Sequence, residues 1–446
     1  MKQIHILEDP VRKVFFSYLI PSVSATFVTS IYILADTVMI GHGIGAVGIA
    51  ALNILLPLYN TFFGVGMMCG VGGSVLFGVR KGQRNLREAR EYFTMGLLMM
   101  LFISILASLA GNLFFRPLLS FLGMTSSMEA HTIPYARILV TAAPVFALSS
   151  FLQVFVRNDD APKLSMTGVI AGGVTNVILD YVYIFIMKWG MAGAVLATVT
   201  GTTLTVLILC THFFSKENNL KLVKNISFRK MGEILGNGMS SFILEVSNGV
   251  VTLLFNRQLL FYIGDIGVVV YGIISNTACV VISVSNGIAQ TVQPILSANF
   301  GAGKRGRVLE ARRLGLIAAL SAGVVFAGSG YLFPVQLSYL FLEPTEEILR
   351  MAVPAIHLYF ASFLIGEWNI LYGTYFQSVV RPGLSLLITL LRGVILNSIL
   401  VFLLPALFGV DGIWITVTVS EFITALVTTY LIRRERKELT TSVSCG

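Results

Sequence analysis

Two aspartates lie inside apolar stretches that are long enough to cross a membrane. Asp36 falls within the apolar run from Val14 to Ile40, and Asp180 falls within the segment NVILDYVYIF. A charge at the centre of a bilayer costs roughly 2.5 to 3.5 kcal/mol on insertion scales, so intramembrane acids usually face a protein interior or a water-filled path. Both aspartates are therefore candidates for binding protons or other cations.

Each aspartate has a polar side chain one helical turn before it. Tyr32 precedes Asp36 by four residues, and Asn176 precedes Asp180 by four residues. This spacing places each pair on one face of a helix. Burial disfavours the charged form of a carboxyl group, and two neighbouring carboxyl groups titrate as a coupled pair. If the two faces share a pocket, we expect that pocket to bind and release protons near neutral pH.

Three glutamates also lie within apolar segments. Glu245 in SSFILEVSNGVV and Glu367 in IGEWNILYGTYF are candidates for a second cation site or a substrate site in the second half of the chain. Glu421, in the last apolar segment, is expected simply to pair with a neighbour. Arg257 and Arg392 remain within predicted helices, and Arg257 either neutralises an acid or extends to the membrane interface.

The composition identifies the elements that position these residues. Of 446 residues, 55% are hydrophobic and 12% are charged, whereas soluble domains carry about 25% charged residues. Apolar segments of about 20 residues can each span a bilayer. Twelve such segments can be drawn, with cores at residues 14–40, 52–79, 92–115, 132–156, 164–187, 191–214, 235–262, 268–297, 314–337, 351–378, 384–407 and 411–432. The sequence predicts an all-α polytopic membrane protein with twelve transmembrane helices.

Basic residues predict the orientation of these helices, because cytoplasmic loops collect Lys and Arg. With the N-terminus inside, 25 of the 31 basic residues fall on the cytoplasmic side, and both termini are predicted to be cytoplasmic. Membrane topology thus explains the formal net charge of +9, and no nucleic-acid partner is expected. The four cysteines are far apart in the sequence and lack histidines at metal-binding spacing, so we expect free thiols, no metal centre and no cofactor.

The two halves of the chain repeat each other. APKLSMTG parallels RPGLSLLI, and WGMAGAVLATV parallels FGVDGIWITVTV, at offsets of 219 to 220 residues. Six helices per half give both halves the same orientation, as in transporters with parallel repeats related by a pseudo-two-fold axis along the membrane normal. We therefore predict an N-lobe at residues 1–214, a cytoplasmic linker at 215–233 and a C-lobe at 234–446.

Several motifs in order resemble one family over essentially the whole chain. They are Pro21, ADTVMIGHGIG, the loop from Gly78 to Gln83, LQVFVRNDDAPKLSM, NVILDYVYIF followed by GMAGAVLATV, and NFGAGKR. The chain resembles the multidrug and toxic compound extrusion (MATE) transporters, in particular the bacterial drug-exporter type. This resemblance implies two six-helix lobes around a central cleft.

The resemblance also implies roles for particular residues. Proton-coupled members use N-lobe acids, which carries that role onto Asp36 and Asp180. Tyr32, Asn176 and Thr198 are then their network partners. Pro21 matches the position where the first helix is proposed to bend on protonation.

Sodium-coupled members use C-lobe acids instead. Glu245 matches that pattern and is the residue at which we would expect sodium, whereas Glu367 is only approximately placed. The surroundings of Glu367 are not typical of sodium-dependent members. Asp160 is a further departure, because related sequences often have Gly there. The coupling ion is therefore H⁺ or Na⁺, with H⁺ favoured.

These features predict an antiporter that exports lipophilic cations across the bacterial plasma membrane by alternating access. Desolvated carboxylates attract small organic cations, and aromatic surfaces add cation–π contacts. The protein is expected to contact membrane lipids and to act as a monomer. The alternative is a flippase or an exporter of an endogenous lipid-linked or metabolite substrate. An enzyme is not expected, since the sequence has no HExxH, nucleophile elbow or Walker lysine, and a scaffold would be recognised by the absence of flux.

Overall fold

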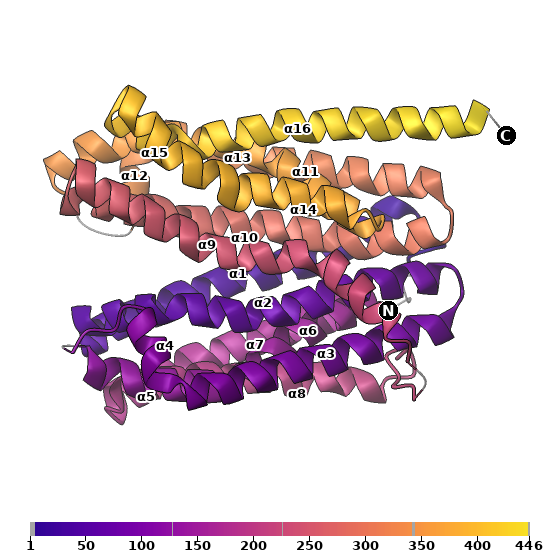
Figure 1. Cartoon of the computed structure of the whole chain (residues 1–446), viewed down its shortest axis with the longest axis horizontal. Coiled ribbons are helices and arrows are strands. Elements are labelled where there is room, and N and C mark those ends of the chain that lie inside the picture. The colour runs from indigo at the N-terminus through magenta and orange to yellow at the C-terminus, as the bar shows by residue number, and fades with distance from the viewer. Residues whose placement is uncertain (1–4, 127, 225, 341–343, 445–446) are drawn as a thin grey trace. The chain divides into compact units, whose positions relative to one another are not determined.

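Helices make up nearly all of the structure. The computed structural model describes residues 5–126, 128–224, 226–340 and 344–444, and these residues contain no β-strand (Figure 1). Within these ranges, eleven helices are long and apolar enough to cross a membrane. A twelfth span results if α5 (Glu129–Thr141) and α6 (Ala143–Asn158), which meet at a bend of 53°, are counted as one. The predicted all-α, twelve-helix fold is confirmed.

The order of helices repeats between the two halves of the chain. The first half contains α1 (Val11–Ile44), α2 (Ala46–Gly82), α3 (Leu86–Leu113), α4 (Phe115–Phe121), α5, α6, α7 (Pro162–Asp180), the π-helix η1 (Tyr181–Ile186), α8 (Gly190–Cys210) and η2 (Thr211–Phe214). The second half contains α9 (Arg229–Tyr262), α10 (Asp265–Gly301), α11 (Arg305–Leu332), α12 (Pro334–Tyr339), α13 (Glu346–Ser378), α14 (Pro382–Leu390), the π-helix η3 (Leu391–Ile395), α15 (Leu396–Phe408) and α16 (Val410–Ser444). Each half therefore has long helices, one short interfacial helix and one helix with a π-helical segment.

The repeat is also seen in the backbone conformation of single residues. Positive φ angles recur at offsets of 219 or 220 residues, in the pairs Gly45 (92°) and Gly264 (86°), Arg84 (60°) and Gly303 (68°), Asp160 (62°) and Val380 (56°), and Gly190 (55°) and Gly409 (60°). Non-glycine residues rarely adopt this region. Matching turns at a constant offset therefore allow residues of the two halves to be compared one by one.

A buried carboxylate holds the first half together where α6 ends. Asp159 is 1% exposed, and its carboxylate lies 2.9 Å from Lys81 Nζ and 2.9 Å from His212 Nε2. Asn219 donates to the same carboxylate from its backbone N–H at 2.8 Å and from Nδ2 at 2.9 Å. Burial acts to raise the pKa of Asp159, but these partners outweigh it and hold the pKa at about 2. Asp159 therefore remains charged and joins α2, α6, η2 and the linker.

The next residue adopts a backbone conformation that favours glycine. Asp160 has φ 62°, in the left-handed region where glycine is favoured and Asp is tolerated. Its side chain accepts a hydrogen bond from Lys81 Nζ at 2.8 Å and one from Tyr18 Oη at 3.3 Å. The side chain thus gains two partners in exchange for a less favourable backbone conformation.

Val380 occupies the same backbone position in the second half without such compensation. Its φ of 56° is costly for a β-branched residue, and the left-handed conformation costs roughly 1 to 2 kcal/mol. Glycine lacks that cost but loses more chain entropy on folding. We expect Val380→Gly to stabilise the protein by about 0.5 to 1 kcal/mol, measured as a higher thermal unfolding midpoint in detergent. Asp160→Gly is the matched control and should not stabilise, because it loses the contacts with Lys81 and Tyr18. A lower midpoint for Val380→Gly would contradict the prediction.

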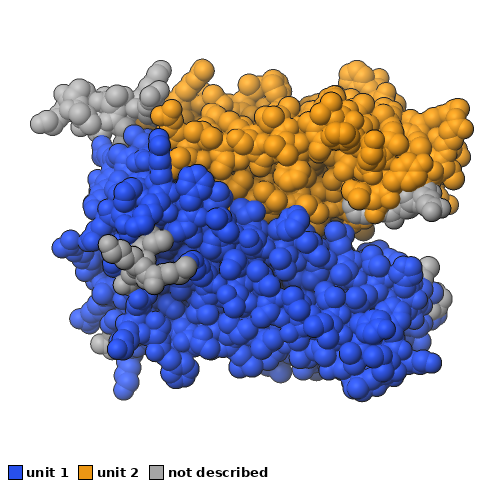
Figure 2. Space-filling model, turned by 180° about the vertical axis from the view of Figure 1, so that it is seen from behind, with its two compact units in different colours: residues 1–249, 290–311 blue, residues 250–289, 312–446 orange. Residues whose placement is uncertain are grey.

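The chain forms two compact units, coloured separately in Figure 2. Unit 1 consists of residues 1–249 and 290–311, and unit 2 consists of residues 250–289 and 312–446. Helices α9, α10 and α11 contribute residues to both units. This division differs in kind from the predicted N-lobe, linker and C-lobe at 1–214, 215–233 and 234–446, which follow the repeat, and those lobe boundaries stay a prediction.

Candidate functional site

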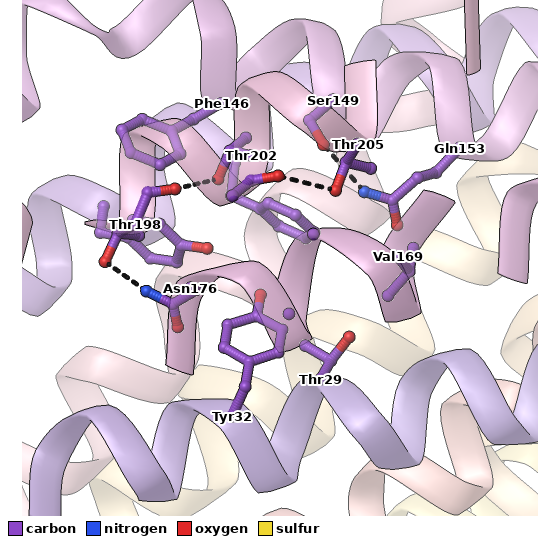
Figure 3. Close-up of a pocket in the computed structure, with 15 residues that line it drawn as sticks. Thr29, Tyr32, Phe146, Ser149, Gln153, Val169, Asn176, Thr198, Thr202 and Thr205 are labelled. Atoms are coloured by element: carbon purple, nitrogen blue, oxygen red, sulfur yellow. Dashed lines mark hydrogen bonds between the residues drawn. The ribbon is translucent and has the colours of Figure 1, made fainter. Parts of the chain in front are cut away.

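A small polar pocket lies in unit 1 among α1, α2, α6, α7 and α8 (Figure 3). Its lining residues are Thr29, Tyr32, Tyr59, Phe63, Phe146, Ser149, Gln153, Val169, Gly172, Gly173, Asn176, Thr198, Gly201, Thr202 and Thr205. The cavity volume is about 40 Å³, which is room for a few water molecules. Drug-sized ligands need pockets of about 300 Å³ or more, so this pocket suits water and small cations.

Glycines bring α7 and α8 close enough to form the pocket. A Cβ atom at Gly172 would lie 2.0 Å from Thr205 Oγ1 and 2.6 Å from the Gly201 carbonyl oxygen. A Cβ atom at Gly201 would in turn lie 2.5 Å from the Gly172 carbonyl oxygen and 3.0 Å from Asn176 Cβ. Small residues allow such close helix contacts in membranes. The two glycines therefore set the distance between the helices that carry the polar side chains.

Across this contact, α7 and α8 share a hydrogen bond. Asn176 Nδ2 donates to Thr198 Oγ1 at 3.3 Å (Figure 3). Asn176 is 3% exposed, and its Oδ1 is buried with no hydrogen-bond partner among the described residues. An unpaired buried amide oxygen is costly unless water or a cation satisfies it. This oxygen is an available ligand beside the pocket.

The two predicted aspartates come together at this site. The carboxyl groups of Asp36 on α1 and Asp180 on α7 face each other closely enough to interact directly. Asp180 is fully buried. Within the described part of the chain, neither Asp180 oxygen has a hydrogen-bond partner, and Asp36 Oδ1 also has none. Two such carboxyl groups cannot both stay charged without a compensating proton or cation.

Tyr32 completes the link between α1 and the pocket. Its ring packs against Gly173 of α7, where a Cβ atom would lie only 2.8 Å from Tyr32 Cδ1. The Tyr32 hydroxyl is hydrogen-bonded to the hydroxyl of Tyr59 on α2. Tyr32, one turn before Asp36, thus lines the pocket and connects α1 with both α2 and α7.

The backbone is irregular directly after Asp180, and the helix that carries Asp36 contains a proline. The π-helix η1 begins directly after Asp180, and π-helical turns occur frequently at functional sites. Pro21 lies inside α1, fifteen residues before Asp36, and it cannot donate a backbone hydrogen bond within the helix. The helix nevertheless continues from Val11 to Ile44. Pro21 therefore leaves one helical hydrogen bond of α1 unmade, and its role as a hinge stays a prediction.

Several pocket residues were not identified from the sequence. Gln153 donates to Ser149 Oγ at 3.1 Å on α6, and Tyr59 reaches the pocket from α2. Spacing within α2 or α6 could not show that these residues lie near α1 or α7. Thr198 was implied only by family resemblance, although Thr198 and Thr202 are four residues apart and form one polar stripe on α8. That stripe was the signal that could have indicated the lining of α8.

Glu245 and Glu367 belong to different compact units. Glu245 on α9 belongs to unit 1 and interacts electrostatically with Tyr59. A Cβ atom at Gly64 of α2 would lie 3.3 Å from Glu245 Cβ. Glu367 on α13 belongs to unit 2, is 2% exposed, and accepts a hydrogen bond from Ser285 Oγ. Their predicted role as a cation or substrate site stays a prediction.

Glu421 pairs with a neighbour, as predicted. Arg392 Nη2 lies 2.6 Å from Glu421 Oε1, and Asn369 Nδ2 donates to Glu421 Oε2 at 2.7 Å. Arg257, in contrast, is exposed on α9. No three His, Cys, Asp or Glu side chains converge to hold a metal ion in the described residues. A cation at the pocket would therefore rely on Asp36 and Asp180 with neutral oxygen ligands.

Comparisons with known proteins agree with the fold. The MatE family model matches residues 21–182 and 239–403. The multidrug export protein MepA of Staphylococcus aureus strain NCTC 8325 is 24% identical over 450 residues, covering 99% of this chain and 98% of the relative. MepA of Staphylococcus saprophyticus is 23% identical over 452 residues, covering 98% of this chain and 97% of the relative.

Solved structures share the fold at low sequence identity. A crystal structure of a MATE protein in complex with MaL6 aligns with a TM-score of 0.92 at 19% identity, covering 99% of this chain and 100% of that chain. A MOP superfamily transporter from Pyrococcus furiosus aligns with a TM-score of 0.91 at 20% identity and the same coverage. These likenesses extend over the full length of the chain.

Proposed function

Because this chain belongs to the MatE family of transporters, we propose that it is a cation-coupled antiporter that exports lipophilic, cationic drugs. Drug export is the activity named for its MepA relatives. The single observation that supports coupling is the pair of facing carboxyl groups of Asp36 and buried Asp180 beside a water-sized pocket. Such a pair can bind and release a proton or another cation during a transport cycle.

In the proposed mechanism, a cation from outside the cell neutralises the aspartate pair. One proton shared between Asp36 and Asp180 removes their repulsion and links α1 to α7. Loss of that proton restores the repulsion, which favours separation of the two helices or binding of another cation. Alternating access follows if outward- and inward-open states differ in their affinity for the proton, since a ligand shifts an equilibrium only by its differential affinity.

Sodium is the second candidate for the coupling ion. Asp36, Asp180, the unpartnered Oδ1 of Asn176 and the hydroxyl of Thr198 offer three kinds of oxygen ligand in one region, namely carboxylate, amide and hydroxyl. Hard cations are bound by oxygen ligands. The pocket volume of about 40 Å³ suits either a sodium ion or water. The drug itself requires a larger site elsewhere in the protein.

A gradient experiment separates these ions. Purified protein in liposomes should drive ethidium movement when an inward proton gradient is imposed, and an equal sodium gradient at constant pH should drive little or none. Protein-free liposomes are the control. Movement driven by sodium alone would identify Na⁺ as the coupling ion. No movement under either gradient would contradict the proposed antiport and favour a transporter of a different, endogenous substrate.

We also propose a plasma-membrane location with both termini in the cytoplasm. The chain is a multi-pass membrane protein, and its MepA relatives are bacterial. The excess of Lys and Arg in alternate loops supports this orientation. With both termini in the cytoplasm, the drug and the coupling ion would cross the membrane through the helices only.

A further inference from the structure

The second half of the chain has polar residues where the first half has its pocket. Arg392 follows Gly172 by 220 residues, Asn369 follows Ser149 by 220, and Glu421 follows Thr202 by 219. Gly172, Ser149 and Thr202 all line the pocket (Figure 3). The offsets are those at which positive φ angles recur in both halves.

These three residues form a closed, charge-paired cluster in unit 2. The Arg392 guanidinium donates to Glu421 Oε1 from Nη2 at 2.6 Å and from Nε at 3.1 Å. Asn369 Nδ2 donates to Glu421 Oε2 at 2.7 Å and to the Glu421 backbone carbonyl at 2.9 Å. Thr428 Oγ1 donates to Asn369 Oδ1 at 3.1 Å. Both oxygens of the Glu421 carboxylate therefore have partners.

Arg392 is suited to this position by its chemistry and its backbone. A guanidinium is always charged and offers several N–H donors to one carboxylate. Arg392 lies in the π-helix η3, and Asn397 Nδ2 donates to its backbone carbonyl at 2.6 Å. The side chains of Arg392 and Glu421 are 16% and 8% exposed. Removing one member of such a buried pair leaves an uncompensated charge.

The two halves thus differ in how their acidic side chains are neutralised. In the first half, the corresponding position holds Gly172, which packs closely against α8 and carries no side chain, and no basic side chain pairs with the acids Asp36 and Asp180 among the ion pairs of the described residues. In the second half, an arginine side chain enters from the corresponding position and neutralises the acid. In the first half, a cation that neutralises the acids must come from the solvent and can be exchanged. In the second half, the protein itself supplies the cation as the side chain of Arg392.

We propose that Arg392 is a tethered cation that fills a latent binding site for a monovalent, guanidinium-like cation, formed by Glu421 and Asn369. Removal of its side chain converts Glu421 into a carboxylate that binds a cation from solution. This proposal concerns unit 2 only and does not depend on the proposed drug export, because its test measures binding through stability.

The test uses the purified full-length Arg392→Gly variant, which introduces the residue found at the corresponding position of the first half. We expect its thermal unfolding midpoint to fall by about 5 °C or more. Methylguanidinium chloride should restore much of that loss saturably, with half-saturation on the order of 1 mM. The same concentrations of urea, a neutral molecule of similar shape, should not restore it. Methylguanidinium should leave the wild-type midpoint unchanged.

A second variant keeps the test decisive if Arg392→Gly folds poorly. Arg392→Gly combined with Glu421→Gln removes both charges, so it should recover yield and should not respond to methylguanidinium. Failure of methylguanidinium to stabilise Arg392→Gly, or equal stabilisation of the double variant, would overturn the proposal. So would a double variant that is as unstable as the single one, because Arg392 would then contribute through packing and not as the cation of Glu421.

Discussion

Replacing Asp36 by Asn should abolish coupled export while leaving the protein in the membrane. Asn has the same shape as Asp but cannot bind a proton or attract a cation, so the pair with Asp180 loses its ion-dependent switch. We expect initial rates of ethidium efflux under a proton gradient to fall at least about tenfold, which corresponds to the loss of only about 1.4 kcal/mol of coupling. Uptake of ethidium into everted membrane vesicles, in which export is directed into the vesicle lumen, measures the effect when it is normalised to the amount of transporter.

Two controls make this result specific. Glu347→Gln removes an exposed carboxylate in the first turn of α13 and should transport like the wild type. Asp180→Asn should resemble Asp36→Asn, and the double variant should be no worse than either single variant, because residues that act as a unit are not additive. Wild-type efflux by Asp36→Asn would contradict the role of the pair.

Replacing Gly172 by Ala should destabilise the first half and disrupt the pocket. The added Cβ atom would lie 2.6 Å from the Gly201 carbonyl oxygen and 2.0 Å from Thr205 Oγ1. Backbone atoms cannot rotate away, so α7 and α8 must separate, and the Asn176–Thr198 hydrogen bond lengthens. We expect a loss of about 3 kcal/mol, seen as a lower thermal unfolding midpoint and reduced yield.

Gly272→Ala is the matched control for this substitution. Gly272 lies within α10, and a Cβ atom there would meet no heavy atom within 4 Å. Combining Gly172→Ala with Thr205→Ala removes one of the two collisions and should restore part of the stability. Equal stability of the Gly172→Ala and Gly272→Ala variants would show that α7 and α8 tolerate a wider separation than the structure indicates.

Much of the fold was predictable because it follows from local rules. Apolar length fixed the spans, and the offset between similar segments revealed the repeat. Tyr32 with Asp36, and Asn176 with Asp180, could be placed on common helix faces because spacing within one helix is a property of the sequence alone. The contact between those two faces was a hypothesis at that stage, because it depends on how α1 packs against α7.

The unpredicted parts depend on contacts between distant segments. Asp159 reads as an ordinary loop acid beside Asp160, and only the fold brings Lys81, His212 and Asn219 around it. Similarly, a neighbour for Glu421 was expected, but its identity as Arg392 required the packing of η3 against α16. Sequence spacing carries no information about such partners, since 29 residues separate the two.

The anchoring of Asn219 by Asp159 changes where the first half of the chain effectively ends. The last helical turn of that half closes at Phe214, yet the backbone N–H of Asn219 is bound in the same buried cluster as Lys81 and His212. A gene divided directly after codon 214 would therefore produce a first fragment in which buried Asp159 lacks both hydrogen bonds from Asn219. A division after codon 221 would keep both hydrogen bonds between Asn219 and Asp159 within the first fragment.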